Sequence, residues 1–277
     1  MTYQELVDTL AAVGIESCEW DAFLLLSHFF SVERTAILSH PSRSYEGEDF
    51  LAAVARRCKR EPLQYILGTW DFYRQSYEVT PDCLIPRSDT EILVEEAIKR
   101  LPENALFADL CTGSGCIAIS VLAERPDTRA YAVDKFERTL DVARRNAIKN
   151  KVDDRFTPLA FDVLEQDFPS DVRFDAILCN PPYIPSSDIP SLSPEVHFEP
   201  SAALDGGNDG LIFYRTLLSS MSHRLKKGGF FLFEIGYDQR EALLSLAHKH
   251  HFPTARVLRD LGGNDRVVYI THERNEQ

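Results

Sequence analysis

The chain has 277 residues, of which 44% are apolar and 26% are charged, a composition typical of soluble globular domains and unlike that of disordered or collagen-like chains. Its 30 basic and 43 acidic residues give a formal net charge of −13, which would repel a phosphate backbone and argues against a nucleic acid substrate. The longest apolar stretch, residues 22–30, is far shorter than the roughly 20 residues of a membrane span, so we expect no membrane insertion.

The first ten residues have neither the cationic start nor the apolar core of a signal peptide, which predicts a cytoplasmic protein. Six cysteines lie scattered along the chain, without a CxxC pair or flanking histidines. We interpret them as reduced thiols that pack as small hydrophobic side chains, and we predict neither a disulfide framework nor a metal site.

Apolar side chains recur at helical spacing in the first 61 residues, as at Leu6, Val7 and Leu10, and predict a small all-helical domain over residues 1–69. The basic run from Arg56 to Arg60 lies at the end of the last predicted helix, where cations complement the helix dipole. We interpret this run as a solvated helix end, with a partner-binding patch as the alternative.

Aromatic and β-branched residues around a polar turn follow, and they predict a β-hairpin that links two domains over residues 70–86. Ser88 and Glu91 then match a capping box, which predicts a helix from Ser88 to about Arg100.

From residue 102 onward, short apolar runs alternate with amphipathic ones. The predicted strands cover residues 106–110, 129–134, 156–162, 174–180, 229–235 and 266–270. Helices are predicted to begin at Gly115 and Phe136 and to cover residues 240–250. This alternation is typical of an α/β fold in which a doubly wound, mostly parallel sheet carries helices on both faces, and we expect it over residues 87–277.

A glycine-containing turn follows the first of these strands and opens a helix, so that backbone can approach a ligand closely. The turn consists of Cys111, Thr112, Gly113, Ser114 and Gly115. Asp134 ends the next strand, nineteen residues after Gly115, where a carboxylate can accept hydrogen bonds from a ribose diol. Together they predict a nucleoside-containing cofactor without saying which one, because the spacing from Gly113 to Ala118 also fits a dinucleotide fingerprint.

Asp162 and Val163 follow the third strand, at the sheet edge where the adenine of such a cofactor would lie. From position alone, a surface loop explains them equally well. An acidic rim suits S-adenosylmethionine better than a pyrophosphate, because its reacting sulfur is positively charged. Charge therefore favours methyl transfer over a nicotinamide-dependent dehydrogenase.

The most specific signal is the tetrapeptide Asn180, Pro181, Pro182 and Tyr183 at the end of the fourth strand. The two prolines restrict the backbone, so the Pro181 carbonyl and the Asn180 side-chain oxygen can present two acceptors to one point. Such a pair suits a planar NH2 group, whose nitrogen it would orient towards an electrophile without a strong base. Tyr183 is expected to supply a flat wall for stacking. As structure alone, the tetrapeptide is a rigid turn.

At this point the sequence resembles the protein-(glutamine-N5) methyltransferases, and most closely the release factor glutamine methyltransferase family. The matching stretches are EPLQYILG at 61–68, LIPRSDTE at 84–91, DLCTGSGCIA at 109–118, AVD at 132–134, NPPYIP at 180–185, FEPSAALDGGNDGL at 198–211 and GGNDRVV at 262–268. The resemblance implies a helical domain that recognises the substrate, a hairpin linker and a class I methyltransferase domain. It also implies S-adenosylmethionine as cofactor and, as substrate, the glutamine of the Gly-Gly-Gln motif in class 1 peptide chain release factors.

The resemblance also implies residue roles. The expected cofactor contacts are Cys111, Thr112, Gly113, Ser114, Gly115, Asp134, Asp162, Val163 and Asn180. The expected contacts to the glutamine amide are Asn180 and Pro181, in a pocket shaped by Pro182 and Tyr183. Cys111 stands where many members have glycine, and Ser88 where a second proline is common. No role is assigned to Arg87 or Glu199. The segment from Ile184 to Pro200 is expected to order over the substrate peptide.

Several alternatives stay open. DLCTGSGCIA and IPRS are similar to the sister family that methylates a glutamine of a large ribosomal subunit protein, while EPLQYILG and GGNDRVV favour the release factor branch. Enzymes that methylate the exocyclic amine of adenine in DNA also use NPPY, but the net charge argues against them. A non-enzymatic binding module would be favoured only if the cofactor failed to bind.

Overall fold

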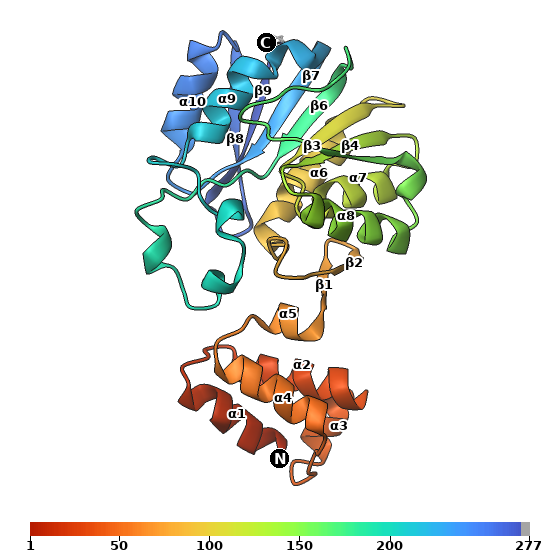
Figure 1. Cartoon of the computed structure of the whole chain (residues 1–277), viewed down its shortest axis with the longest axis vertical. Helices are drawn as coiled ribbons and strands as arrows, with labels where there is room; N and C mark the ends of the chain where they lie inside the picture. The colour runs from red at the N-terminus through yellow and green to blue at the C-terminus, as the bar shows by residue number, and fades with distance from the viewer. Residues whose placement is uncertain (273–277) are drawn as a thin grey trace. The chain divides into compact units, whose positions relative to one another are not determined.

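The computed structural model describes residues 1–272, which form two compact units (Figure 1). The helical unit comprises Met1–Thr69 and the short segment Ser193–Phe198. The sheet unit comprises Trp70–Leu192 and continues from Glu199. The domains predicted from the sequence, with boundaries at residues 69 and 86, did not assign Ser193–Phe198 to the helical unit. In the described part of the chain, no helix combines the length and the apolar character that a bilayer span needs.

Five short helices build the helical unit. They are α1 (Tyr3–Ala12), α2 (Cys18–Phe30), α3 (Arg34–Ser39), α4 (Glu48–Cys58) and α5 (Leu63–Leu67). The first begins at a capping box in which the side chains of Thr2 and Glu5 each bind the backbone of the other residue. Leu6, Leu25 and Phe50 form the centre of a core that excludes water. The all-helical character predicted from the periodicity is confirmed.

The interpretation of the basic run as a solvated helix end is wrong for Arg57. Its side chain is 6% exposed and pairs with the equally buried Asp21 at 2.6 Å. Arg60 pairs with Glu195 of the returning segment at 2.7 Å, and Arg57 reaches the same carboxylate at 3.1 Å. Two of the cations therefore hold the helical unit together, because a buried charge is stable only when it is paired.

The hairpin consists of β1 (Thr69–Phe72) and β2 (Gln75–Glu78). The capping box predicted after it is wrong, because Ser88–Thr90 form a 3-10 turn and α6 (Glu91–Arg100) begins without a side-chain cap. The Glu91 carboxylate instead accepts a hydrogen bond from the backbone N–H of Tyr73 at 2.9 Å and ties the hairpin to α6.

Seven strands form the main sheet, in the order β5-β4-β3-β6-β7-β9-β8. Their bounds are β3 Leu106–Leu110, β4 Arg129–Asp134, β5 Phe156–Ala160, β6 Phe174–Cys179, β7 Leu225–Glu234, β8 Thr254–Arg259 and β9 Asp265–Thr271. The first five strands of this order pair in parallel, and β9 is antiparallel to both β7 and β8. The mostly parallel sheet is confirmed, although the periodicity missed β8.

Helices cover both faces of the sheet (Figure 1). On one face lie α6, α7 (Cys116–Glu124) and α8 (Glu137–Lys149), and on the other lie α9 (Ile212–Ser220) and α10 (Arg240–Lys249). Short 3-10 turns cover Asp153–Arg155, Ile189–Ser191, Val196–Phe198, Ser201–Ala203 and Ser222–Arg224. After β3 the chain proceeds to one side of the sheet, and after β6 it proceeds to the other. Such a reversal leaves a crevice between the loops that follow these two strands, which is where doubly wound sheets bind ligands.

Candidate active site

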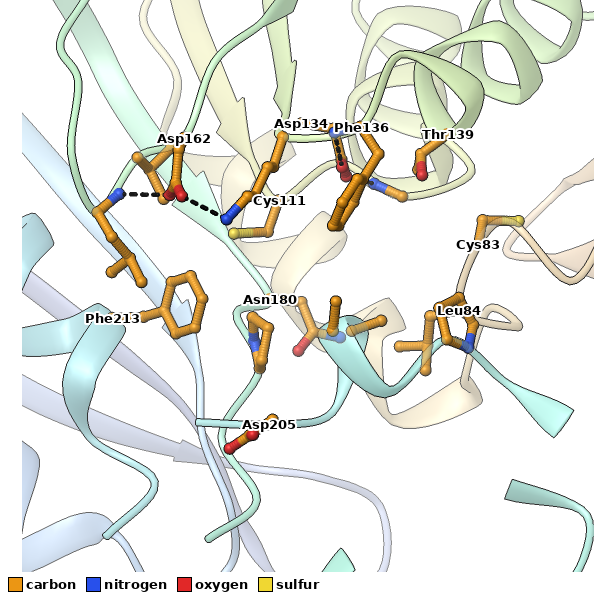
Figure 2. A pocket seen from close by; sticks show the side chains of 18 of the residues that line it. Cys83, Leu84, Cys111, Asp134, Phe136, Thr139, Asp162, Asn180, Asp205 and Phe213 are labelled. Carbon is orange, nitrogen blue, oxygen red and sulfur yellow. Dashed lines mark hydrogen bonds and ion pairs between the residues drawn. The ribbon is translucent and has the colours of Figure 1, made fainter. Parts of the chain in front are cut away.

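A cavity of about 340 Å³ lies in the sheet unit, at the carboxyl ends of its parallel strands (Figure 2). Its walls come from the segment after the hairpin, from the loops that follow β3 to β6, and from residues 200–213. Small-molecule ligand sites in proteins have comparable volumes, roughly 300–1,000 Å³.

Seven of the predicted site residues line this cavity: Cys111, Gly113, Asp134, Asp162, Val163, Asn180 and Pro182. Five others are not among the lining residues: Thr112, Ser114, Gly115, Pro181 and Tyr183. In the view of Figure 2, Asp134 and Asp162 lie on one side of the cavity, with Asn180 between them and Asp205.

The turn after β3 owes its shape to left-handed backbone at Cys111, Gly113 and Gly115, whose φ angles are 58°, 57° and 83°. A Cβ atom on Gly115 would lie 2.8 Å from the side chain of Ile119 and 3.3 Å from that of Ala143. The left-handed backbone favours glycine at this position, and a Cβ atom would in addition displace the end of the Ile119 side chain and crowd Ala143.

The buried side chain of Asp109 holds the turn in place by hydrogen bonds. Its Oδ2 atom accepts hydrogen bonds from the Thr112 hydroxyl at 2.6 Å and from the Ala118 N–H at 3.2 Å. Complete burial raises the pKa of Asp109 to about 7, although both hydrogen bonds favour the charged form. Thr112 thus anchors the turn to the sheet rather than facing the cavity.

Asp134 presents a held carboxylate to the cavity. One of its oxygens accepts a hydrogen bond from the Gly113 N–H and the other accepts one from the Phe136 N–H, both at 3.1 Å (Figure 2). Burial raises the pKa of Asp134 against the effect of these donors. A carboxylate has about four acceptor positions, so this one can still accept hydrogen bonds from a diol.

Asp162 has a different environment. It pairs with Lys135 at 2.7 Å and accepts a hydrogen bond from the Leu164 N–H at 2.9 Å (Figure 2). Partial burial opposes its ionisation, but the Lys135 ammonium and the N–H outweigh this effect and hold the pKa of Asp162 below its usual value. The acidic rim predicted from the sequence is therefore half neutralised, because Lys135 offsets one of its two charges.

Flat and branched apolar side chains form much of the remaining wall: Leu84, Phe136, Phe161, Val163, Leu164, Ile212 and Phe213. Of these, only Val163 was predicted as a site residue. Leu84 begins the matching stretch 84–91 and the rest lie outside the quoted motifs. Their hydrophobicity alone cannot be distinguished from that of the core. Together they suit a planar aromatic ligand group.

Asn180 follows β6 and reaches the cavity with its side chain held at one end. Its Nδ2 group donates a hydrogen bond to the hydroxyl of Thr90 at 3.2 Å. Thr90 is buried and does not line the cavity, so the Oδ1 end of the Asn180 amide is the end that faces the ligand space.

The ring of Tyr183 packs against the apolar core around α9 and β7, and Pro182 lines the cavity instead. Burial raises the pKa of Tyr183 to about 12. The stacking role expected of Tyr183 from the sequence stays a prediction.

The backbone after Asn180 is held by a second segment. The Ile184 N–H donates to the Leu204 carbonyl at 3.0 Å, and the Gly206 N–H donates back to the Ile184 carbonyl at 2.8 Å. The Gln239 side-chain amide donates to the Tyr183 carbonyl at 3.0 Å. The sequence analysis did not predict this support. The two adjacent glycines at 206 and 207 were the signal that could have indicated it.

Glu199 is buried and holds two segments near the cavity together without lining it. Its carboxylate accepts a hydrogen bond from the Ile85 N–H at 3.0 Å and pairs with Arg87. These contacts join the segment before residue 200 to the chain that leads from the hairpin. The sequence assigned no role to either residue, and the structure gives both a scaffolding contact.

Known proteins resemble this chain over both units. Residues 2–68 match the family model for the PrmC N-terminal domain, and residues 88–192 match that for the methyltransferase small domain. A release factor glutamine methyltransferase of Geobacter sulfurreducens is 40% identical over 94% of this chain and 91% of its own length. One of Caulobacter vibrioides is 39% identical over 94% and 92%.

This chain belongs to the release factor glutamine methyltransferase family. The resemblance stated from the sequence motifs is thereby confirmed, and so is the predicted class of enzyme, a methyltransferase. A solved structure of a release factor-specific protein-(glutamine-N5) methyltransferase from Alicyclobacillus acidocaldarius is 32% identical, covers 72% of this chain and all of its own chain, and has a TM-score of 0.43.

Proposed function

We propose that this protein transfers a methyl group from S-adenosylmethionine to the side-chain amide nitrogen of the glutamine in the Gly-Gly-Gln motif of class 1 peptide chain release factors. Family membership supports the choice of substrate, because the relatives are named release factor glutamine methyltransferases. The observation that carries the chemistry is the held amide of Asn180, whose oxygen faces the same cavity as the carboxylate of Asp134.

The cavity residues fit the proposed cofactor. Asp134 would accept hydrogen bonds from the ribose hydroxyls, and the side chains of Phe161 and Val163 would contact the adenine. When bound, S-adenosylmethionine supplies an electrophilic methyl group on a positively charged sulfur. Asp134 has no cationic side chain paired with it in the described part of the chain, and its negative charge would favour such a ligand.

Asn180 and Pro181 would hold the substrate amide. The Asn180 Oδ1 atom and the Pro181 carbonyl accept its two N–H groups, so the nitrogen is oriented by both hydrogens at once. Pro182 lines the cavity beside Asn180 and restricts the space around this nitrogen. An amide nitrogen is a weak nucleophile, so orientation is the main contribution that these residues can make.

The same two acceptors serve the transition state. As the methyl carbon forms its bond to the amide nitrogen, its bond to sulfur would break and uncharged S-adenosylhomocysteine would be the leaving group. Positive charge then develops on the nitrogen, whose protons become more acidic. Acceptors fixed before the reaction stabilise that charge without reorganisation, and one proton passes to water once the bond is made. A strong base near the nitrogen is therefore not required.

The helical unit would recognise the release factor. Its match to the PrmC N-terminal domain supports this role, since the relatives that share it are named for that substrate. The segment from Ile184 to Pro200 would order over the substrate peptide. Part of it, Ser193–Phe198, packs with the helical unit through Glu195, which supports a role for both in the same binding event.

The test is an incubation of the purified chain with S-adenosylmethionine and unmethylated class 1 release factor, followed by peptide mass spectrometry. A methyl group on the glutamine of Gly-Gly-Gln is expected, and a release factor with alanine at that position serves as the control. Methylation elsewhere, or none, would contradict the proposal. The ribosomal protein and then DNA would be the next substrates to test.

A further inference from the structure

The side-chain amide of Asn180 has a donor end and an acceptor end, and only one orientation can bind a substrate NH2 group. With Oδ1 towards the cavity, Asn180 accepts a hydrogen bond from the substrate. In the flipped orientation two NH2 groups would face each other, and both would remain unpaired. Something must therefore fix this amide, because its two orientations have nearly the same shape.

Thr90 is the direct partner of the amide. Its hydroxyl accepts the hydrogen bond from Asn180 Nδ2 at 3.2 Å, and its side chain is 2% exposed. A hydroxyl can also donate to an amide oxygen, so this contact alone would permit both orientations. The orientation is decided only if the proton of the Thr90 hydroxyl is already engaged elsewhere.

Glu234 can engage that proton. It is the last residue of β7 and follows Phe233, which lies opposite Cys179 in the register of β6 and β7, so Glu234 comes next to Asn180. Glu234 is 1% exposed. Burial raises the pKa of its carboxyl, and the neighbouring side chain of Thr90 lowers it, as does that of Tyr183. Its Oε2 atom has no partner within residues 1–272. A buried carboxylate in this state is a strong acceptor.

The directions of the hydrogen bonds then follow. An ionised carboxylate only accepts, so the neighbouring Thr90 hydroxyl can interact with Glu234 only as a donor. The Thr90 oxygen is left to accept, so it takes the N–H of Asn180. The acceptor end of Asn180 then faces the cavity.

We propose that Glu234 and Thr90 are positioning residues, which fix the side-chain amide of Asn180 with its oxygen towards the substrate. The proposal rests on the proposed function for the identity of the substrate amide. The orientation of Asn180 itself can be measured without any substrate, so the two proposals can fail separately.

The kinetic test compares Thr90→Val with Thr90→Ser at pH 8.5, where Glu234 is ionised. Valine keeps the shape of threonine and removes the hydroxyl, whereas serine keeps the hydroxyl. We expect Thr90→Val to lower kcat by about tenfold, the equivalent of one lost hydrogen bond, and Thr90→Ser to restore most of it. The Kd for S-adenosylmethionine should be unchanged in both variants.

A double-mutant cycle with Asn180→Ala separates positioning from a general structural effect. If Thr90 acts through Asn180, Thr90→Val should cost no further turnover once Asn180 is alanine. Wild-type turnover in Thr90→Val, or an equal loss with and without Asn180, would overturn the proposal.

The substrate-free test is the NMR signal of the Asn180 side-chain NH2, assigned by its loss in Asn180→Ala. We expect one of its protons to be protected from exchange with water in the wild type, to lose that protection in Thr90→Val, and to keep it in Thr90→Ser. Equal exchange in all three would overturn the proposal. Should the wild type fail to methylate release factor, the proposed function fails, and this measurement still decides the orientation.

Discussion

The backbone of Gly206 lies directly against that of Tyr183: a Cβ atom on Gly206 would be 2.8 Å from the Tyr183 Cα atom and 2.9 Å from the Pro182 carbonyl oxygen. Gly206→Ala should therefore displace the Asn180–Tyr183 backbone and lower kcat by at least tenfold, since misplacement by an ångström can cost about 100-fold. Gly47→Ala is the control, because its nearest contact would be an ordinary 3.8 Å. Equal kcat values for the two variants would contradict this explanation.

Asn180→Ala should remove most of the turnover and leave cofactor affinity largely intact. The substitution deletes one of the two proposed amide acceptors, while Asp134 and the aromatic wall remain. A loss of kcat of roughly 100-fold, with a Kd for S-adenosylmethionine within about twofold of wild type, is the expected result. Kinetics with release factor and calorimetry with the cofactor measure the two quantities, and unchanged turnover would refute the assignment.

Asp134→Asn should weaken cofactor binding. The amide keeps one acceptor oxygen but loses the charge and half of the acceptor capacity that the ribose diol would use. The Kd for S-adenosylmethionine should rise about 10- to 100-fold, as expected for hydrogen bonds to a charged group. Asp82→Asn is the matched control, because Asp82 also lines the cavity but pairs with Arg138. A wild-type Kd in Asp134→Asn would exclude the ribose role.

Cys111 has a φ of 58°, in the left-handed region where a side chain costs about 1–2 kcal/mol. Cys111→Gly should therefore keep the free energy of unfolding within about 1 kcal/mol of wild type, because relieved strain offsets the added chain entropy. Cys111→Val should lose about 2 kcal/mol or more, since a branched side chain resists this backbone. Urea unfolding measures both, with Cys58→Val as the control. Similar losses for the two valine variants would show that backbone angle is not the cause.

Glu234 makes stability depend on pH in a definite direction. Burial raises the pKa of Glu234 to about 7 from its ordinary 4.5, so between these values the folded protein holds a proton that the unfolded chain releases. In the wild type, the contribution of Glu234 to the free energy of unfolding is fully present below pH 4.5, and it is lost as pH rises through 7. Because glutamine does not ionise, Glu234→Gln does not lose this contribution. Its free energy of unfolding relative to wild type should therefore increase by on the order of 3 kcal/mol from pH 5 to pH 8. A stability difference that is the same at both pH values would contradict the raised pKa.

Local signals in the sequence predicted much of this molecule. The alternation of strands and helices follows from periodicity, and the positions of Gly113, Asp134 and Asn180 at strand ends place them at one edge of a parallel sheet. The capping box predicted at Ser88 failed because a local pattern does not show competing partners. The Glu91 carboxylate accepts a hydrogen bond from the N–H of Tyr73 on the hairpin instead.

The supports of the site could not be read in the same way. Thr90 and Asn180 are 90 residues apart, and Glu234 comes next to Asn180 only because β6 and β7 are neighbours with a particular register. The neutralisation of Asp162 by Lys135 likewise depends on the fold that brings two loops together. Each of these residue types is common on protein surfaces, so only the tertiary structure reveals their relationship.

The return of Ser193–Phe198 to the helical unit has a consequence for exchanging parts between relatives. The chain passes between the two units three times, after Thr69, after Leu192 and after Phe198. A chimaera that took only residues 1–69 from a relative would keep the native Glu195 but replace the segment whose Arg57 and Arg60 pair with it. An exchange of the helical unit therefore has to carry two pieces together, residues 1–69 and the six residues Ser193–Phe198.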